Sequence, residues 1–157
     1  MNLSSITDNG YEVIVASLLA NIIAQITKTI VNAFQKRTWQ TRMLYSTGGM
    51  PSSHSSTVTA IATSIGLVDG FSSTSFALAV GIAAIVMYDA AGVRLAASKQ
   101  AEVLNKILNE LFNKHPTLKS TRLKELLGHT PIQVLAGAAV GIGVSYGFHY
   151  YLTGFWA

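Results

Sequence analysis

A histidine and two serines stand at one predicted helix start, within the stretch Gly48–Ser56 (GGMPSSHSS). The glycines indicate a tight turn, and Pro51 suits the first helical position because its missing N–H needs no partner there. Ser52, Ser53 and His54 would then fill a first turn whose unpaired N–H groups and helix dipole attract anions. We expect these three residues to bind phosphate. The alternative is an ordinary serine-capped helix start with a surface histidine.

A second histidine precedes another predicted helix start, in the sequence GHTP. The order Thr130, Pro131 and Gln133 predicts an N-cap, a first helical residue and a capping-box partner. His129 stands immediately before this cap. Because imidazole changes its charge near neutral pH, it can serve as an acid, a base or a nucleophile. We expect His54 and His129 to meet over one anion pocket.

A polar stripe runs along the first predicted helix, Tyr11–Phe34. Its members Asn21, Gln25, Lys28 and Asn32 recur at helical spacing and therefore share one face. This face is expected to contact other helices. Lys28 either belongs to a functional site or extends to the membrane surface.

An acidic residue interrupts a later apolar helix, predicted from Phe76 to Leu95. Asp89 needs a partner there, because an isolated charge in apolar surroundings is costly. An ion pair with Arg94 or Lys28 is one interpretation, and orientation of a catalytic group is another; both can hold together. Lys28, Arg42 and Arg94 are expected to bind phosphate oxygens, arginine as a fork and lysine as a point charge.

The composition is that of a membrane protein. Half of the 157 residues are hydrophobic and 11% are charged, against about 25% in soluble domains, and the mean hydropathy is +0.40. We expect one domain over residues 1–157: an all-α integral membrane helix bundle with about four transmembrane helices and one amphipathic interfacial helix. The transmembrane helices are predicted at Tyr11–Phe34, Pro51–Leu67, Phe76–Leu95 and Pro131–Leu152.

The amphipathic helix is predicted over residues 98–113, with Val103, Leu104 and Ile107 on its apolar face and charged side chains opposite. Such a helix can lie in the membrane interface or pack on a partner subunit.

The sequence contains no cysteine, which excludes disulfides and zinc–cysteine sites. Nucleic acid is not an expected partner despite the pI near 9.5, because the basic residues flank apolar segments.

The distribution of positive charge predicts the membrane topology. All 11 Lys and Arg residues lie between Lys28 and Lys124, close to the two connections that four spans would place on one side. By the positive-inside rule that side is cytoplasmic, so both termini are expected outside and the histidines inside. The segment before Tyr11 has no basic residue, so the first helix is expected to be retained rather than cleaved.

Three motifs resemble the divergent branch of the type 2 phosphatidic acid phosphatase superfamily, which includes lipid phosphate phosphatases and vanadium haloperoxidases. They are PSSH at Pro51–His54, YDAAGVR at Tyr88–Arg94 and LLGHTPIQVLAGAAVG at Leu126–Gly141. Within this branch the chain resembles small, YuiD-like bacterial membrane proteins, which implies a bacterial plasma membrane.

The resemblance implies roles for individual residues. His129 would be the nucleophile that forms a phosphohistidine, His54 the general acid, and Ser52 part of the phosphate pocket. Arg94 would be the phosphate-binding arginine, with Arg122 as its rival. Lys28 would replace the lysine of the superfamily motif. Gln133 stands where the family has an aspartate that orients the nucleophile, and Asp89 or Glu125 would compensate for that exchange if the fold brings either to His129.

The leading hypothesis is a membrane phosphatase that hydrolyses a lipid phosphate or diphosphate at the cytoplasmic face. It requires neither metal nor cofactor; a His54, His129 and Asp89 metal site is an alternative that the spacing does not select. The second hypothesis is a non-catalytic binder or transporter of phosphorylated lipids, and the third a purely structural helix bundle.

The glycine pairs Gly137/Gly141 and Gly143/Gly147 suggest close helix contact, within the bundle or in a homodimer.

Overall fold

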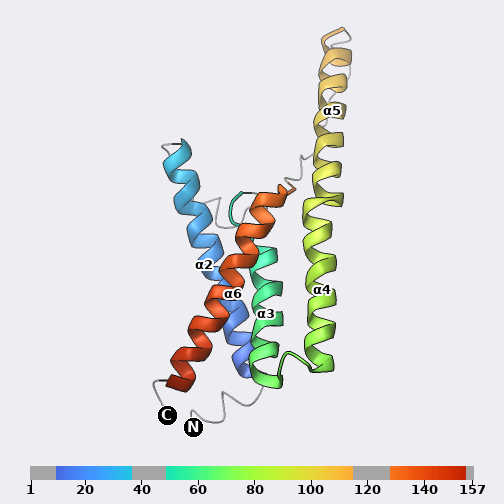
Figure 1. Cartoon of the computed structure of the whole chain (residues 1–157). Coiled ribbons are helices and arrows are strands. Elements are labelled where there is room, and N and C mark those ends of the chain that lie inside the picture. Colours follow the sequence, from blue (N-terminus) through green and yellow to red (C-terminus); the bar gives the residue numbers. More distant parts are fainter. Residues whose placement is uncertain (1–9, 37–48, 115–127, 155–157) are drawn as a thin grey trace.

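The computed structural model describes residues 10–36, 49–114 and 128–154 (Figure 1). These residues form helices and connecting turns, with no strand among them, which confirms an all-α membrane helix bundle. The helices are α2 (Tyr11–Lys36), α3 (Ser53–Asp69), α4 (Thr74–Ala91), α5 (Val93–Lys114) and α6 (Pro131–Gly154).

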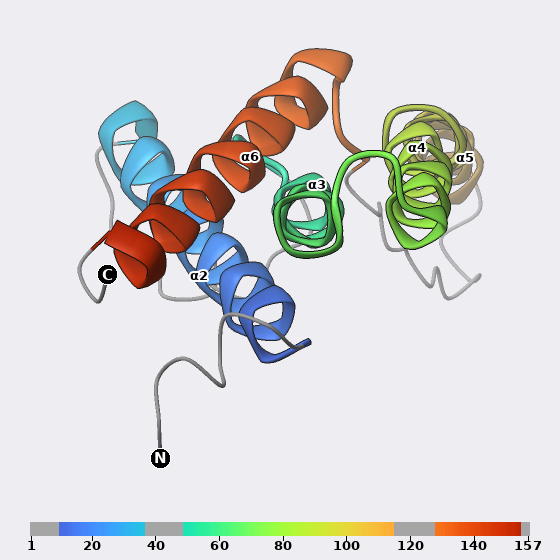
Figure 2. The same ribbon diagram turned by 60° about the horizontal axis from the view of Figure 1, so that its bottom comes forward.

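Helix α3 is the central element of the bundle. It contacts α2, α4 and α6, and the end-on view shows it between the crossed pair α2 and α6 on one side and α4 on the other (Figure 2). Helices α3 and α6 run in the same direction, and α2 and α4 run in the opposite one (Figure 1). One end of the bundle therefore holds the starts of α3 and α6, and the other holds the start of α2 and the end of α6.

Two glycines let α6 approach α3 closely. A Cβ atom added at Gly137 would collide with the backbone carbonyl of Ser52, and one at Gly141 with the carbonyl of Ser56. Gly143 and Gly147 have nothing within 4 Å of such an atom. The first glycine pair is therefore used for packing inside the bundle, and the second faces outward.

Hydroxyl groups on α3 and α6 fix how the three packed helices align. Ser56 Oγ donates to the carbonyl of Ala20 on α2 at 3.0 Å, and Ser145 Oγ on α6 donates to the carbonyl of Ala60 at 3.0 Å. Thr57 Oγ1 accepts a hydrogen bond from Asn21 at 2.9 Å. These bonds satisfy polar groups that lipid cannot satisfy, so they hold the register of the helices.

Three helical segments are long and apolar enough to cross a membrane: Tyr11–Phe34, Thr74–Glu110 and Pro131–Gly154. Helix α3 was expected to be a fourth span, but it has 17 residues and is rich in Ser and Thr, so it falls short of the other three. Its small side chains are buried against its neighbours, whereas large apolar side chains of the other helices point outward. The bundle thus encloses its polar helix and exposes apolar surface.

Two predicted helix boundaries were wrong. Helix α3 begins at Ser53, not at Pro51, because the Ser52 side chain caps it by accepting the N–H of Ser55 at 3.4 Å. The predicted helix Phe76–Leu95 ends at Ala91, because Gly92 breaks the regular backbone. The amphipathic stretch is present as part of α5, which continues in line with α4 (Figure 1).

Candidate functional site

The imidazole rings of His54 and His129 lie next to each other at one end of the bundle. Their centroids are 6.2 Å apart and the ring planes meet at 62°. His54 is in the first turn of α3, and His129 lies just before α6. The two helix starts are joined directly, because the N–H of Ser52 donates to the carbonyl of Gln133 at 3.0 Å.

The backbone of His129 is anchored to the end of α4. Its N–H donates to the carbonyl of Ala90 at 3.1 Å, and the preceding Gly128 lies against the backbone of Arg94 and Leu95, where a Cβ atom would collide. The side chain is buried, with 2% of the residue exposed. This contact brings the segment of Arg94 beside His129, although a long stretch of sequence separates them.

The hydrogen bonds of Gln133 determine which nitrogen of His129 carries the proton. Gln133 Oε1 accepts the N–H of Thr130 at 3.1 Å, and Thr130 Oγ1 accepts the N–H of Gln133 at 3.4 Å, which confirms the predicted capping box. The same oxygen lies 3.4 Å from Nδ1 of His129. Because this oxygen can only accept, Nδ1 carries the hydrogen and Nε2 carries the lone pair. Nε2 is buried and has no hydrogen-bond partner among the described residues.

The surroundings of His129 keep its ring neutral. Burial lowers the pKa of His129 below its usual value, and the positive charge of Lys28 and the ring of His54 lower it further. The hydrogen bond to Gln133 and the backbone of Gly49 oppose this effect only in part. Neutral imidazole is the form that can act as a nucleophile.

Lys28 is buried rather than extended to the membrane surface. Only 1% of the residue is exposed, and its Nζ donates to Gln25 Oε1 at 2.8 Å. Its aliphatic stem lies against Gly49, whose φ of 104° favours glycine and where a Cβ atom would be 3.1 Å from the lysine Cγ. Because Gly49 belongs to the turn before α3, this contact places the lysine at the same end as the histidines.

Asp89 and Arg94 form an ion pair at the junction of α4 and α5. Arg94 Nε lies 2.7 Å from Asp89 Oδ2, and their side chains are 55% and 42% exposed. In the part of the chain that the structure describes, the Asp89 carboxylate thus pairs with Arg94 rather than with His54 or His129. One of the two sequence-based interpretations of Asp89, the ion pair, is therefore confirmed. Glu125, the other residue expected to compensate for Gln133, lies outside the described residues.

The remaining expected phosphate ligands are placed as follows. Ser52 is fully buried, and its hydroxyl caps α3 and accepts the hydroxyl of Ser55 at 3.1 Å. Ser53 is buried as the first residue of α3. Arg42 lies outside the described residues, and so does Arg122, the rival of Arg94. One end of the bundle thus holds a cluster of groups suited to binding an anion: two imidazoles, one buried amine and one helix start.

Sequence reasoning missed a second polar pair, Glu12 and His149, at the opposite end of the bundle. A carboxylate in an apolar helix and a histidine in another are each unusual in membrane spans, and this signal was present in the sequence. Among the described residues, no group of three His, Asp or Glu side chains is arranged to hold a metal ion.

Comparisons with known proteins identify the family. The sequence model of the divergent PAP2 family, named after the type 2 phosphatidic acid phosphatases, matches residues 10–144. The chain is 41% identical over 139 residues to a Bacillus subtilis (strain 168) protein described as the uncharacterized membrane protein YuiD, covering 82% of this chain and 88% of that protein. No solved structure matches. The chain therefore belongs to the divergent PAP2 family.

Proposed function

We propose that this chain is a membrane phosphatase that hydrolyses a lipid phosphate or diphosphate through a phosphohistidine at His129. The observation that carries the proposal is the buried Nε2 of His129, which has no hydrogen-bond partner among the described residues and lies beside His54. Membership of a family related to the phosphatidic acid phosphatases supports the same class of reaction.

In the first step, the lone pair of His129 Nε2 attacks phosphorus, and the bond from phosphorus to the leaving oxygen breaks. His54 donates a proton to that oxygen, so the lipid leaves as a neutral alcohol or as a phosphate monoester. Burial and the charges of Arg94 and Lys28 lower the pKa of His54, so the imidazolium that donates is the less populated form of this ring and a strong acid. Gln133 holds the Nδ1–H of His129 throughout and keeps Nε2 directed to the reaction. His54 is exposed, which suits a group that must meet both the leaving lipid and water.

In the second step, His54 acts as the base. It now lacks a proton and accepts one from water as the water oxygen attacks phosphorus. The bond from phosphorus to His129 Nε2 breaks, inorganic phosphate leaves, and both imidazoles return to their starting states. Such transfer depends mainly on positioning and on fixed charge near the phosphoryl oxygens.

That fixed charge comes from Lys28, Arg94 and the N–H groups at the start of α3. Lys28 is buried and held by Gln25, so its charge is already oriented before substrate arrives. Arg94 must exchange part of its contact with Asp89 for a phosphoryl oxygen. Because the pair is exposed, that exchange costs little.

An apolar cavity supports a lipid rather than a water-soluble phosphate ester as substrate. It has a volume of about 350 Å³ and lies between α3, α4 and α6. Phe76, Val80 and Ile142 are among its lining residues, and Met87 extends the lining to within two residues of Asp89. A hydrocarbon chain in this cavity would lead from the membrane toward the histidines.

The distribution of charge supports a cytoplasmic active site. All 11 Lys and Arg residues lie between Lys28 and Lys124, and the helix ends that carry Lys28, His54 and His129 share one end of the bundle. By the positive-inside rule this end faces the cytoplasm of a bacterium, and the start of α2 and the end of α6 face outward.

The test is phosphate release from a lipid phosphate by the purified protein in detergent micelles. His129→Ala should abolish release and also the acid-labile phosphoprotein that labelled substrate forms with the wild type. His54→Ala should slow release by about 10²- to 10⁴-fold, and by less with an aryl phosphate, whose leaving group needs no proton. Tyr150→Ala, an exposed residue of α6, is the control. An unchanged rate in folded His129→Ala would refute the proposal.

Gln133 favours one other function, binding or transport of a phosphorylated lipid without turnover. A neutral amide, rather than a carboxylate, contacts Nδ1 of His129, so a charged imidazolium at His129 has no direct counter-ion there. Under this second candidate, the wild type and His129→Ala would both bind lipid phosphates, and neither would release phosphate from any member of a broad substrate panel.

A further inference from the structure

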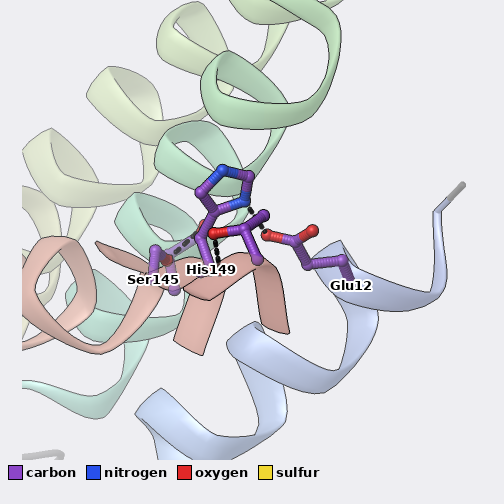
Figure 3. A network of polar contacts seen from close by, with 5 residues as sticks. Glu12, Ser145 and His149 are labelled. Atoms are coloured by element: carbon purple, nitrogen blue, oxygen red, sulfur yellow. Dashed lines mark hydrogen bonds and ion pairs between the residues drawn. The ribbon is translucent and has the colours of Figure 1, made fainter. Parts of the chain in front are cut away.

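A carboxylate on α2 contacts an imidazole on α6 at the end of the bundle opposite His129. Glu12 is fully buried, and its Oε1 lies 2.8 Å from Nδ1 of His149. Figure 3 shows the carboxylate of Glu12 pointing from the first turn of α2 toward the ring of His149 on α6. The second carboxylate oxygen, Oε2, is buried and has no hydrogen-bond partner among the described residues.

A third polar group lies at the same level on α3. The hydrogen bonds from Ser56 to Ala20 and from Ser145 to Ala60 set the alignment of the three helices. Eight residues further along α3 from Ser56, and four residues further along α6 from Ser145, this alignment brings Ser64 to the level of Glu12 and His149. The hydroxyl of Ser64 is also buried without a hydrogen-bond partner among the described residues.

His149 is the sole cationic side chain available to Glu12 on these helices. Helices α3 and α6 contain no Lys or Arg, and the first basic residue of α2 is Lys28, about 24 Å further along the helix axis. Helix α4 carries one charged residue, Asp89, at the other end of the bundle. The other titratable side chains toward this end are Tyr11 on α2, Asp69 on α3, and Tyr146, Tyr150 and Tyr151 on α6.

We propose that Glu12 and His149 form an intramembrane proton-binding site. A buried carboxylate beside a neutral imidazole would leave one negative charge uncompensated in apolar surroundings, which is strongly unfavourable. The pair therefore holds one proton, either as carboxyl with imidazole or as carboxylate with imidazolium, and both forms have zero net charge. The site exchanges this proton as a unit rather than as two independent groups.

The imidazole is the more accessible member of the pair. The side chain of His149 is 27% exposed, whereas that of Glu12 is 0% exposed, so the imidazole is the route by which a proton enters or leaves. The pair lies at the end of the bundle where α2 starts and α6 ends (Figure 1). The chain thus carries titratable groups at both ends, and this proposal is independent of catalysis at His129.

The experiment is nuclear magnetic resonance on protein labelled with ¹⁵N-histidine and ¹³C-glutamate in detergent micelles. In the wild type, the His149 imidazole and the Glu12 carboxyl signals should change together, at the same pH values. Glu12→Gln should change the pH dependence of the His149 signal, because the imidazole then has no carboxylate with which to share the proton. Glu102→Gln, an exposed glutamate of α5, is the matched control and should leave that pH dependence unchanged.

Two results would overturn the proposal. One is a His149 titration that is the same in Glu12→Gln as in the wild type. The other is independent titration of the two signals in the wild type, a measurement that needs no variant and therefore holds even if Glu12→Gln fails to fold.

Discussion

The amide oxygen of Gln133 lies 3.4 Å from Nδ1 of His129 and at the same time accepts the N–H of Thr130. One side chain thus caps α6 and fixes the ring of the proposed nucleophile. An amide can orient an imidazole but cannot stabilise the positive charge that develops when its other nitrogen bonds to phosphorus. In hydrolase triads, loss of the corresponding carboxylate lowers kcat by about four orders of magnitude.

Gln133→Glu should therefore raise kcat. The substitution keeps the length of the side chain and its hydrogen bonds to His129 and Thr130, and it adds the missing charge. We expect an increase of about 10- to 100-fold in phosphate release, measured under saturating lipid phosphate. Gln133→Met is the control: it removes the cap, at a cost of about 1 kcal/mol in stability, and adds no charge. Equal rates for the wild type and Gln133→Glu would contradict the role given to His129.

The neutral state of His129 gives a prediction about pH. Burial and the charge of Lys28 lower the pKa of His129, so its ring should stay unprotonated as the pH falls through about 6.5, where ordinary histidine titrates. Lys28→Met removes the charge of Lys28 and leaves burial and His54 in place, so the pKa of His129 should rise but remain below the ordinary value. The ¹⁵N signal of His129 followed against pH measures both effects. A titration of His129 that Lys28→Met leaves in place would show that the two groups do not interact.

Variants of the ion pair between Asp89 and Arg94 can distinguish two roles for the aspartate: holding Arg94 and orienting a catalytic histidine. If Asp89 acts only by holding Arg94, Asp89→Asn should free the guanidinium and lower the KM for an aryl phosphate, with kcat little changed. Arg94→Ala should raise that KM. Because the pair is exposed, either change should alter the stability by about 1 kcal/mol or less. A loss of kcat in Asp89→Asn would instead support the expected orientation of a catalytic histidine.

Glycine substitutions on α6 test the packing that holds the site together. Gly141→Ala places a methyl group against the carbonyl of Ser56 on α3 and should destabilise the protein by about 1–3 kcal/mol. Gly143→Ala, two residues further on, meets open space and should be neutral or slightly stabilising. Thermal unfolding in detergent compares the two variants. Equal melting temperatures would show that α6 does not approach α3 as described.

Features that depend on neighbouring residues could be predicted from the sequence. The cap formed by Thr130 and Gln133, the start of α6 at Pro131 and the inward face of α2 with Asn21 and Lys28 all follow from spacing within a few turns. Each depends on hydrogen bonds or helix periodicity that a short segment contains. The contact between the YDAAGVR and GHTP segments, through Ala90 and His129, could not be predicted in this way.

Features that depend on tertiary contacts were missed or left open. The contact between His149 and Glu12 joins residues near opposite ends of the chain, and no local pattern indicates it. The start of α3 at Ser53, rather than at the predicted Pro51, depends on which hydroxyl caps the helix. The choice between surface extension and burial for Lys28 depends on Gly49, which leaves room for its stem.

The expected homodimer stays a prediction. The fold restricts which face of α6 can contact a second copy of the chain. Gly137 and Gly141 are occupied by α3, whereas Gly143 and Gly147 face outward on α6. If two copies pair through α6, Gly147→Cys should form a disulfide-linked dimer in membranes under mild oxidation, and Gly141→Cys should not, because a disulfide requires the two Cα atoms to come within about 7 Å. The native sequence has no cysteine, so each variant carries one thiol. Dimer bands on a non-reducing gel measure the outcome. A dimer from Gly141→Cys, or none from either Gly143→Cys or Gly147→Cys, would exclude pairing through this face of α6.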